Sequence, residues 1–150
     1  MRLPCAALGV LVALSVTTAC GGSKSLSKEQ YASRLSAMCE DFSKREQAIG
    51  DPQSVEDLVE KGPRVVEAFE QAIVEPVHEL KAPDEISDQA SRLTDLADQQ
   101  RDVLVGLVAA AKRSDFEAVN ELASKNATLN RESSSIAKEL GATSCANDQG

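Results

Sequence analysis

Hydrophobic residues recur at every third or fourth position from residue 26 to residue 140, which is the spacing that places side chains on one face of an α-helix. The alternation of apolar and polar residues that is typical of β-strands does not appear in this stretch. Turn-forming residues near 50–52, 82–85 and 113–115 divide the pattern into four amphipathic segments. We therefore predict an all-α domain over residues 27–145, folded as an up-down-up-down four-helix bundle, and a disordered tail over residues 146–150.

Capping residues predict where the helices begin. Ser27 opens a Ser-x-x-Gln pattern and Ser114 opens a Ser-x-x-Glu pattern, and both are capping boxes. Ser54 stands as the N-cap of the second helix. We expect the third helix to run from about residue 86 to 113. Helix four then begins after Ser114, with Phe116 at the head of its inward apolar stripe.

Glycine and proline predict where the helices end or bend. Gly50 and Gly141 stand where a left-handed residue commonly terminates a helix. A proline inside a helix removes a hydrogen bond and clashes with the preceding turn. Gly62-Pro63 therefore predicts a break or kink in the second helix, and Pro76 predicts another.

Residues 1–19 have the features of an export signal. Arg2 supplies a positive charge, residues 3–16 form an apolar run, and small residues follow. The apolar run is shorter than the ~20 residues that a transmembrane helix needs. Cys20 comes next, and the Gly- and Ser-containing stretch that completes residues 20–26 predicts a flexible linker.

The junction of Ala19 and Cys20, followed by Gly21-Gly22, resembles the lipobox of bacterial lipoproteins. The resemblance implies that Cys20 becomes the lipidated first residue, and that its acyl chains hold the protein at the cell membrane, outside the cytoplasm. The alternative is an ordinary signal that is cleaved nearby and leaves Cys20 as a free thiol.

The other cysteines predict a disulfide. Cys5 leaves with the signal, so Cys39 and Cys145 remain as a pair in an oxidising compartment. Their bond closes a loop of roughly 100 residues, for which chain entropy predicts about 4–5 kcal/mol of stabilisation. A catalytic thiol or half of a metal site is the alternative, but neither has a histidine partner nearby.

The predicted disulfide conflicts with an ideal bundle. Cys39 lies about 16–18 Å along the first helix from its start. The segment from Gly141 to Cys145 spans about 13–16 Å when extended. The bond therefore requires that the tail folds back, that the last helix stops early, or that the first helix extends beyond its neighbours.

Several features together resemble the small helical lipoproteins and secreted proteins of actinobacteria. These are the lipobox, the spacing from Tyr31 to Cys39, the turn from Leu80 to Pro83, and the late Cys145. Members of that group mostly lack an assigned activity. The resemblance therefore implies a location and a fold, and it implies no catalytic residue.

Composition excludes several classes of function. The chain has 150 residues, a formal net charge of −8 and one histidine. Such an acidic chain is unsuited to electrostatic binding of nucleic acid or anionic lipid. No tryptophan, one tyrosine and three phenylalanines are poor material for stacking bases. The carboxylates fall on outward or capping positions, where we expect a solvated face, with weak calcium binding as the alternative.

The sequence shows no catalytic motif. Nucleophile-elbow, P-loop, dinucleotide and zinc-protease patterns are absent. Glu75-x-x-His78 matches half of a di-iron bundle motif, but the second half needs another histidine, and Pro76 disturbs the spacing. We expect His78 to be a surface residue, and we predict a non-enzyme without a cofactor.

A polar layer is the most informative feature inside the bundle. Gln100 lies on the inward stripe of the third helix, and Asn126 and Ser133 lie on that of the fourth. Counted from the turn at Ser114, Gln100, Asn126 and Asn130 stand at one height, and Ser36 of the first helix is close to it. The layer is either mutually hydrogen-bonded, which would fix the register of the helices, or the wall of a ligand pocket.

These observations predict a lipid-anchored, extracytoplasmic and non-enzymatic module that presents a helical surface to an envelope protein. The alternative is a carrier that binds an apolar or amphipathic small molecule between the helices. A continuous internal cavity above about 300 Å³ would favour the carrier.

Overall fold

The computed structural model describes residues 26–146. The predicted signal (residues 1–19), Cys20 with most of its linker, and residues 147–150 of the predicted tail (146–150) lie outside the described residues. Within 26–146 the secondary structure is entirely helical. In chain order the elements are α1 (Lys28–Ile49), α2 (Val55–Phe69), the π-helix η1 (Glu70–Val74), α3 (Glu75–Glu79), the 3₁₀-helix η2 (Asp84–Ile86), α4 (Ser87–Lys112), α5 (Phe116–Leu140) and the 3₁₀-helix η3 (Thr143–Cys145).

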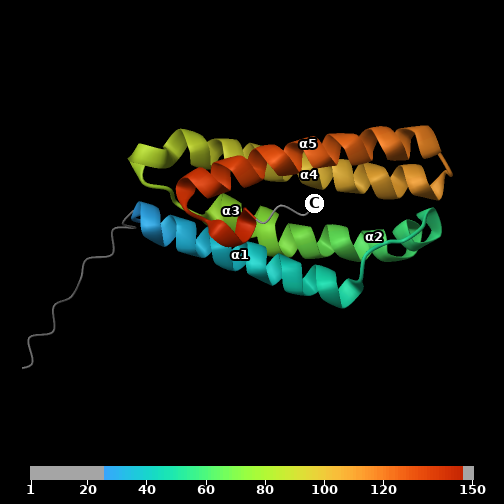
Figure 1. Cartoon of the computed structure of the whole chain (residues 1–150), viewed down its shortest axis with the longest axis horizontal. Helices are drawn as coiled ribbons and strands as arrows, with labels where there is room; N and C mark the ends of the chain where they lie inside the picture. Colours follow the sequence, from blue (N-terminus) through green and yellow to red (C-terminus); the bar gives the residue numbers. More distant parts are fainter. Residues whose placement is uncertain (1–25, 147–150) are drawn as a thin grey trace, which may run out of the picture.

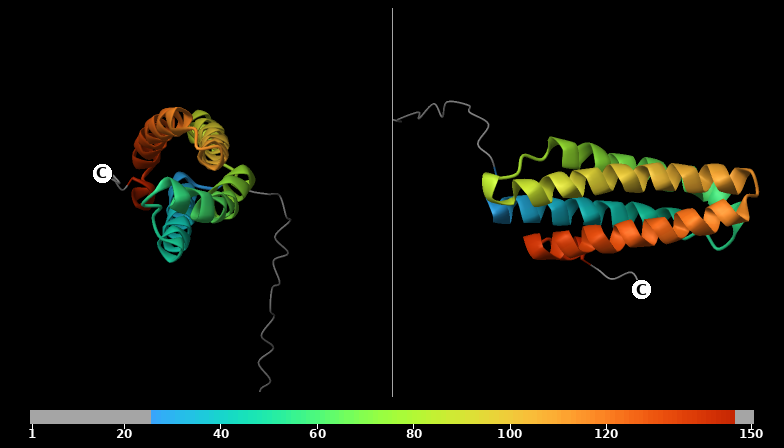
Figure 2. Two further views of the ribbon diagram at one scale, coloured as in Figure 1. Left: turned by 90° about the vertical axis from the view of Figure 1, so that its right-hand side faces the viewer. Right: turned by 90° about the horizontal axis from the view of Figure 1, so that it is seen from above.

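Four helical rods lie side by side with alternating direction (Figure 1). They are α1, the continuous segment from α2 through η1 to α3, α4, and α5. Seen end-on, the rods follow one another in this order around a ring (Figure 2). The predicted all-α, up-down-up-down bundle is confirmed. No helix in the described part of the chain is both long and apolar enough to cross a bilayer.

Most of the predicted caps are present. The Ser27 hydroxyl accepts a hydrogen bond from the N–H of Gln30, and the Gln30 side chain accepts one from the N–H of Ser27. The Ser54 hydroxyl caps α2 by accepting from a backbone N–H at 3.1 Å. Gly50 and Gly141 end α1 and α5 with φ of 79° and 89°. Both ends of α1, the start of α2 and the end of α5 therefore lie where a local side chain or a glycine satisfies the backbone.

The connection from α4 to α5 differs from the prediction by one residue. Asp115, and not Ser114, caps α5, because its carboxylate accepts from the N–H of Ala118 at 3.1 Å. Ser114 instead adopts a left-handed conformation, with φ of 56°, and donates its N–H to the carbonyl of Ala111. Phe116 therefore occupies the first turn of α5 and is 60% exposed, which corrects its predicted inward position.

Gly62 and Pro63 do not interrupt the second rod, because α2 runs through both residues as one α-helix. Gly62 is buried against α4. A Cβ atom at this position would lie 2.5 Å from Cγ2 of Val108. The glycine predicted to break the helix therefore permits a close approach of two helices.

The irregularity of the second rod lies further along, at η1. The N–H of Glu75 donates to the carbonyl of Glu70, five residues earlier, which is the π-helical pattern. Pro76 has no N–H with which to continue an α-helical ladder. The interruption predicted at Pro76 thus takes the form of a π-helical segment that ends just before it.

The hydrophobic core is unevenly distributed. Helix α4 is lined by buried residues along most of its length, and α5 packs extensively against it. The buried residues of α1 are Tyr31, Ala32 and Leu35, all in its first third. Helices α1 and α5 also meet over only a short stretch. The bundle is therefore closely packed at the end where α1 begins and more open beyond it.

The predicted disulfide between Cys39 and Cys145 is present, with a Cα–Cα distance of 5.3 Å. A Cβ atom on Gly141 would lie 3.9 Å from that of Ala32, so α5 ends about one turn inside the start of α1. From there η3 folds back along α1. The geometric conflict is thus resolved by an extended first helix together with a tail that reverses direction.

Candidate ligand pocket

A pocket of about 560 Å³ lies between the helices, where α1 and α5 separate. Every rod of the bundle contributes to its lining. One end is closed by η3 and by the disulfide, because Cys39, Ser144 and Cys145 all line it. We call this space the central pocket.

The floor of the central pocket is apolar. The second rod and α4 supply it with aliphatic and aromatic side chains, namely Val65, Phe69, Ile73, Val77, Leu93, Ala97 and Leu104. Phe42 of α1 packs edge-to-face on Phe69, with ring centroids 5.2 Å apart. This floor can bury an apolar body by the hydrophobic effect.

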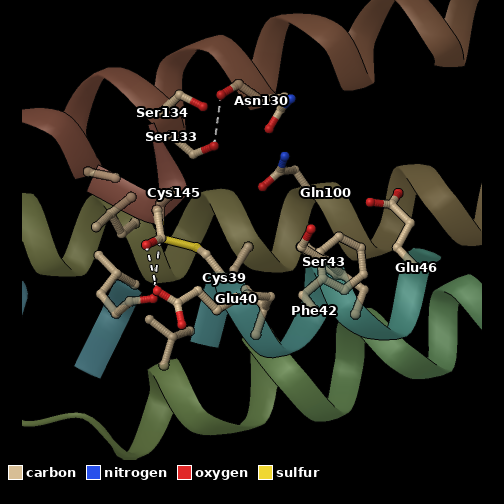
Figure 3. Close-up of a pocket in the computed structure, with 18 of the residues that line it drawn as sticks. Cys39, Glu40, Phe42, Ser43, Glu46, Gln100, Asn130, Ser133, Ser134 and Cys145 are labelled. Carbon is tan, nitrogen blue, oxygen red and sulfur yellow. Dashed lines mark hydrogen bonds between the residues drawn. A yellow bond between two sulfur atoms is a disulfide. The ribbon is translucent and has the colours of Figure 1, made fainter. Parts of the chain in front are cut away.

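The opposite wall carries amides and hydroxyls. Gln100 of α4 and Asn126 and Asn130 of α5 line the same pocket, as do Ser133 and Ser134. Figure 3 shows the amides of Gln100 and Asn130 pointing toward one another across the space. The Ser133 hydroxyl donates to the backbone carbonyl of Asn130 at 3.0 Å. The predicted juxtaposition of Gln100 with Asn126 and Asn130 is therefore present, whereas Ser36 is not among the lining residues.

No hydrogen bond joins the side chains of Gln100, Asn126 and Asn130. Gln100 is 8% exposed, and its amide has no hydrogen-bond partner among the described residues. No fully buried side-chain polar atom in this part of the chain is unsatisfied. The Gln100 amide therefore reaches the open pocket, where a solvent or ligand molecule can bind it.

Among the charged residues that line the pocket, Glu46 is the one that is not exposed. It is half-buried on the pocket side of α1, and burial raises the pKa of its carboxyl, which the negative charge of Asp51 raises further. Glu40, by contrast, accepts a hydrogen bond from the Ser144 hydroxyl at 2.9 Å. Lys44 is the third charged residue of the lining and is itself exposed.

Sequence reasoning missed Glu46 and located the amides. Glu46 follows Phe42 by four residues and Cys39 by seven, so it shares the inward side of α1. That spacing was available in the sequence. A carboxylate is nonetheless expected on the solvated surface. It can face the inside of a bundle only where the helices leave a space, and the sequence pattern does not show where such a space lies.

The remaining sequence candidates lie elsewhere. His78 is exposed, as expected, and its Nε2 atom lies 3.2 Å from the carboxylate of Asp98. Within residues 26–146 no three metal-ligating side chains come together. The possible lipidation site, Cys20, lies outside the described residues. Comparisons of the chain with profiles of known protein families, with curated sequences and with solved structures returned no match.

Proposed function

We propose that the protein is a non-enzymatic binding protein that holds a small amphipathic molecule in the central pocket. The observation that carries this proposal is a cavity of about 560 Å³ with an apolar floor and an amide-bearing wall. Its volume lies within the range of about 300–1,000 Å³ that is typical of small-molecule sites. The apolar body of the ligand would lie on Phe69 and its neighbours, and its polar end would meet Gln100.

The surface supports a docking role less well. Among the described residues the large apolar side chains that are exposed are Val105 and Phe116, at 49% and 60%. Single exposed apolar residues are common on monomeric proteins and define no interface. The binding of an envelope protein to a helical surface therefore remains a prediction, whereas the central pocket favours the carrier.

The carrier would act outside the cytoplasm. The export signal and Ala19-Cys20 support a lipid anchor, and the Cys39–Cys145 disulfide supports an oxidising compartment. A pocket tethered at a membrane by a short linker would receive or deliver its ligand at that membrane.

Filling the pocket tests the proposal. Ala97 is buried in the floor, so Ala97→Phe places a ring in the space that the ligand needs. The probe is N-phenyl-1-naphthylamine, a neutral apolar dye that fluoresces when it leaves water. We expect the wild-type protein to bind it and Ala97→Phe to lose at least about tenfold in affinity, the equivalent of about 1.4 kcal/mol.

Ala123→Phe is the matched control, because Ala123 is exposed on α5 and is not a lining residue. It should bind the dye as the wild type does. Thermal melts followed by circular dichroism would establish that both variants fold. Equal dye binding by all three proteins, or none by the wild type, would contradict the proposal.

A further inference from the structure

Glu46 is a charged residue in a pocket whose lining is otherwise mostly neutral. Its carboxylate is half-buried beside an apolar floor, and no side chain of the described residues forms an ion pair or a hydrogen bond with it. Figure 3 shows it rising from α1 toward the helices opposite. A half-buried charge without a partner loses part of its hydration, which costs free energy. A ligand that supplied the partner would remove this cost and gain affinity.

The charges around the pocket favour a cation over an anion. Glu40 and Glu46 both line it, and Lys44 is the one cationic side chain of the lining. Lys44 is exposed, so its ammonium remains solvated. All lining residues from α2, η1, α3, α4, α5 and η3 are uncharged. Glu40 is exposed as well, so the half-buried Glu46 is the charge that an anionic head group would meet inside the pocket.

The neutral groups also suit a cation that donates hydrogen bonds. Gln100 is more than nine-tenths buried, has no partner among the described residues, and faces the pocket. Its amide oxygen and that of Asn130 are acceptors, and an alkylammonium group has three N–H donors.

We propose that the ligand of the central pocket is an amphipathic organic cation, an apolar body bearing a protonated amine, and that Glu46 is the residue that selects it. This inference rests on the proposed function. Gln100 and Asn130 would accept the remaining N–H groups of the amine. The apolar body would lie along Phe69, Ile73 and Leu104.

Three probes of equal chain length test the selection: decylamine, decanol and decanoate, each kept below its micelle concentration. Binding to the full-length protein, with its disulfide formed, is measured by isothermal titration calorimetry at pH 7. We expect decylamine to bind about tenfold more tightly than decanol, the gain of one charge-assisted hydrogen bond at a half-exposed site. Decanoate should bind most weakly.

Glu46→Gln should abolish the roughly tenfold preference for decylamine over decanol, measured as the ratio of the two affinities. Glu46→Asp, which keeps the charge, should retain much of it. Glu121→Gln is the control for net charge, because Glu121 is exposed on α5 and outside the pocket. It should behave as the wild type does.

The pH dependence gives an independent measurement. Glu46 becomes neutral as the pH falls through its raised pKa, whereas an alkylamine stays protonated. The charged groups near Glu46 are Glu40, Lys44 and Asp51, and the other helices contribute none to the lining. The preference for decylamine should therefore decline on acidification in the wild type, and stay absent in Glu46→Gln.

The outcomes separate the two proposals. Equal affinity for all three probes, or a preference for decylamine that survives Glu46→Gln, would overturn the selection of a cation and leave the carrier intact. Preference for decanoate would overturn it as well. Failure of all three probes while the dye still binds would overturn the selection of a cation, and failure of the dye as well would overturn both proposals.

Discussion

Single residues determine how the interior of this bundle is used. A buried amide normally finds a hydrogen-bond partner in the protein, and a structural layer of amides would rigidify the fold. Gln100 stands at the predicted height and faces Asn130, but no hydrogen bond joins them. The side chains that would fix the register of the helices in a closed bundle are therefore available to a bound molecule.

Replacement of these amides should cost little stability. We expect Gln100→Leu to change the free energy of unfolding by less than about 0.5 kcal/mol, since no protein partner loses a hydrogen bond. In a double-mutant cycle with Asn126→Leu, measured by urea denaturation, the coupling should be near zero. A coupling energy of about 1–3 kcal/mol would indicate a mutually bonded layer and would argue against an open pocket.

At the scale of elements, most helix caps could be predicted from local signals, whereas the close approach of α2 to α4 and the separation of α1 from α5 could not. Caps such as Ser27 depend on residues within one turn, so the sequence contains what determines them. At the last turn, Ser114 and Asp115 are adjacent candidates, and the choice depends on how tightly α4 reverses into α5. The pocket depends on the separation of α1 from α5, which no local pattern describes.

Gly62 is a second residue whose role depends on a contact between two helices and cannot be inferred from its neighbours in the sequence, and this contact can be tested. Gly62→Ala favours the helix by up to about 1 kcal/mol, yet its Cβ would clash with Val108 in rigid packing between helices. We expect a net loss of about 1–2 kcal/mol in stability by urea denaturation. Val108→Ala in the same chain should remove most of the effect of Gly62→Ala.

Gly106→Ala is the matched control for Gly62→Ala. A Cβ atom at Gly106 would meet the end of the Leu122 side chain at 3.2 Å, which a small rotation relieves. It should be neutral or stabilising. If both alanine variants proved equally stable, the close approach of α2 and α4 would not be a constraint on Gly62.

At the scale of the whole molecule, the Cys39–Cys145 disulfide stabilises the side of the bundle where α1 and α5 separate. The loop closed between Cys39 and Cys145 spans 106 positions, and it joins α1 to the tail next to the pocket. The even pair of cysteines predicted this bond. The reversal of η3 that makes it possible arises from a left-handed Gly141 and from the extension of α1 beyond α5.

Loss of the disulfide should destabilise the bundle. The double variant Cys39→Ser with Cys145→Ser should lose about 2–5 kcal/mol in the free energy of unfolding, measured with urea, and the chain-entropy value of about 4–5 kcal/mol is the upper part of this range. Reduced wild-type protein should show a similar loss. Thiol titration of the unfolded, unreduced protein should detect neither Cys39 nor Cys145, and free thiols at both positions would contradict the bond.

The position of that bond also determines which part of the molecule opens most easily. It attaches α1 to the tail near the middle of the helix. The buried residues Tyr31 and Leu35 lie before Cys39, whereas beyond Cys39 the helix has no fully buried residue and Phe42 is only partly buried. Opening of the half that extends to Ile49 therefore requires far less free energy than global unfolding. Amide hydrogens there should exchange with solvent before those of α4. The rate at which this part of α1 moves away from the other helices, while the disulfide holds its middle in place, would then set the lifetime of a bound molecule.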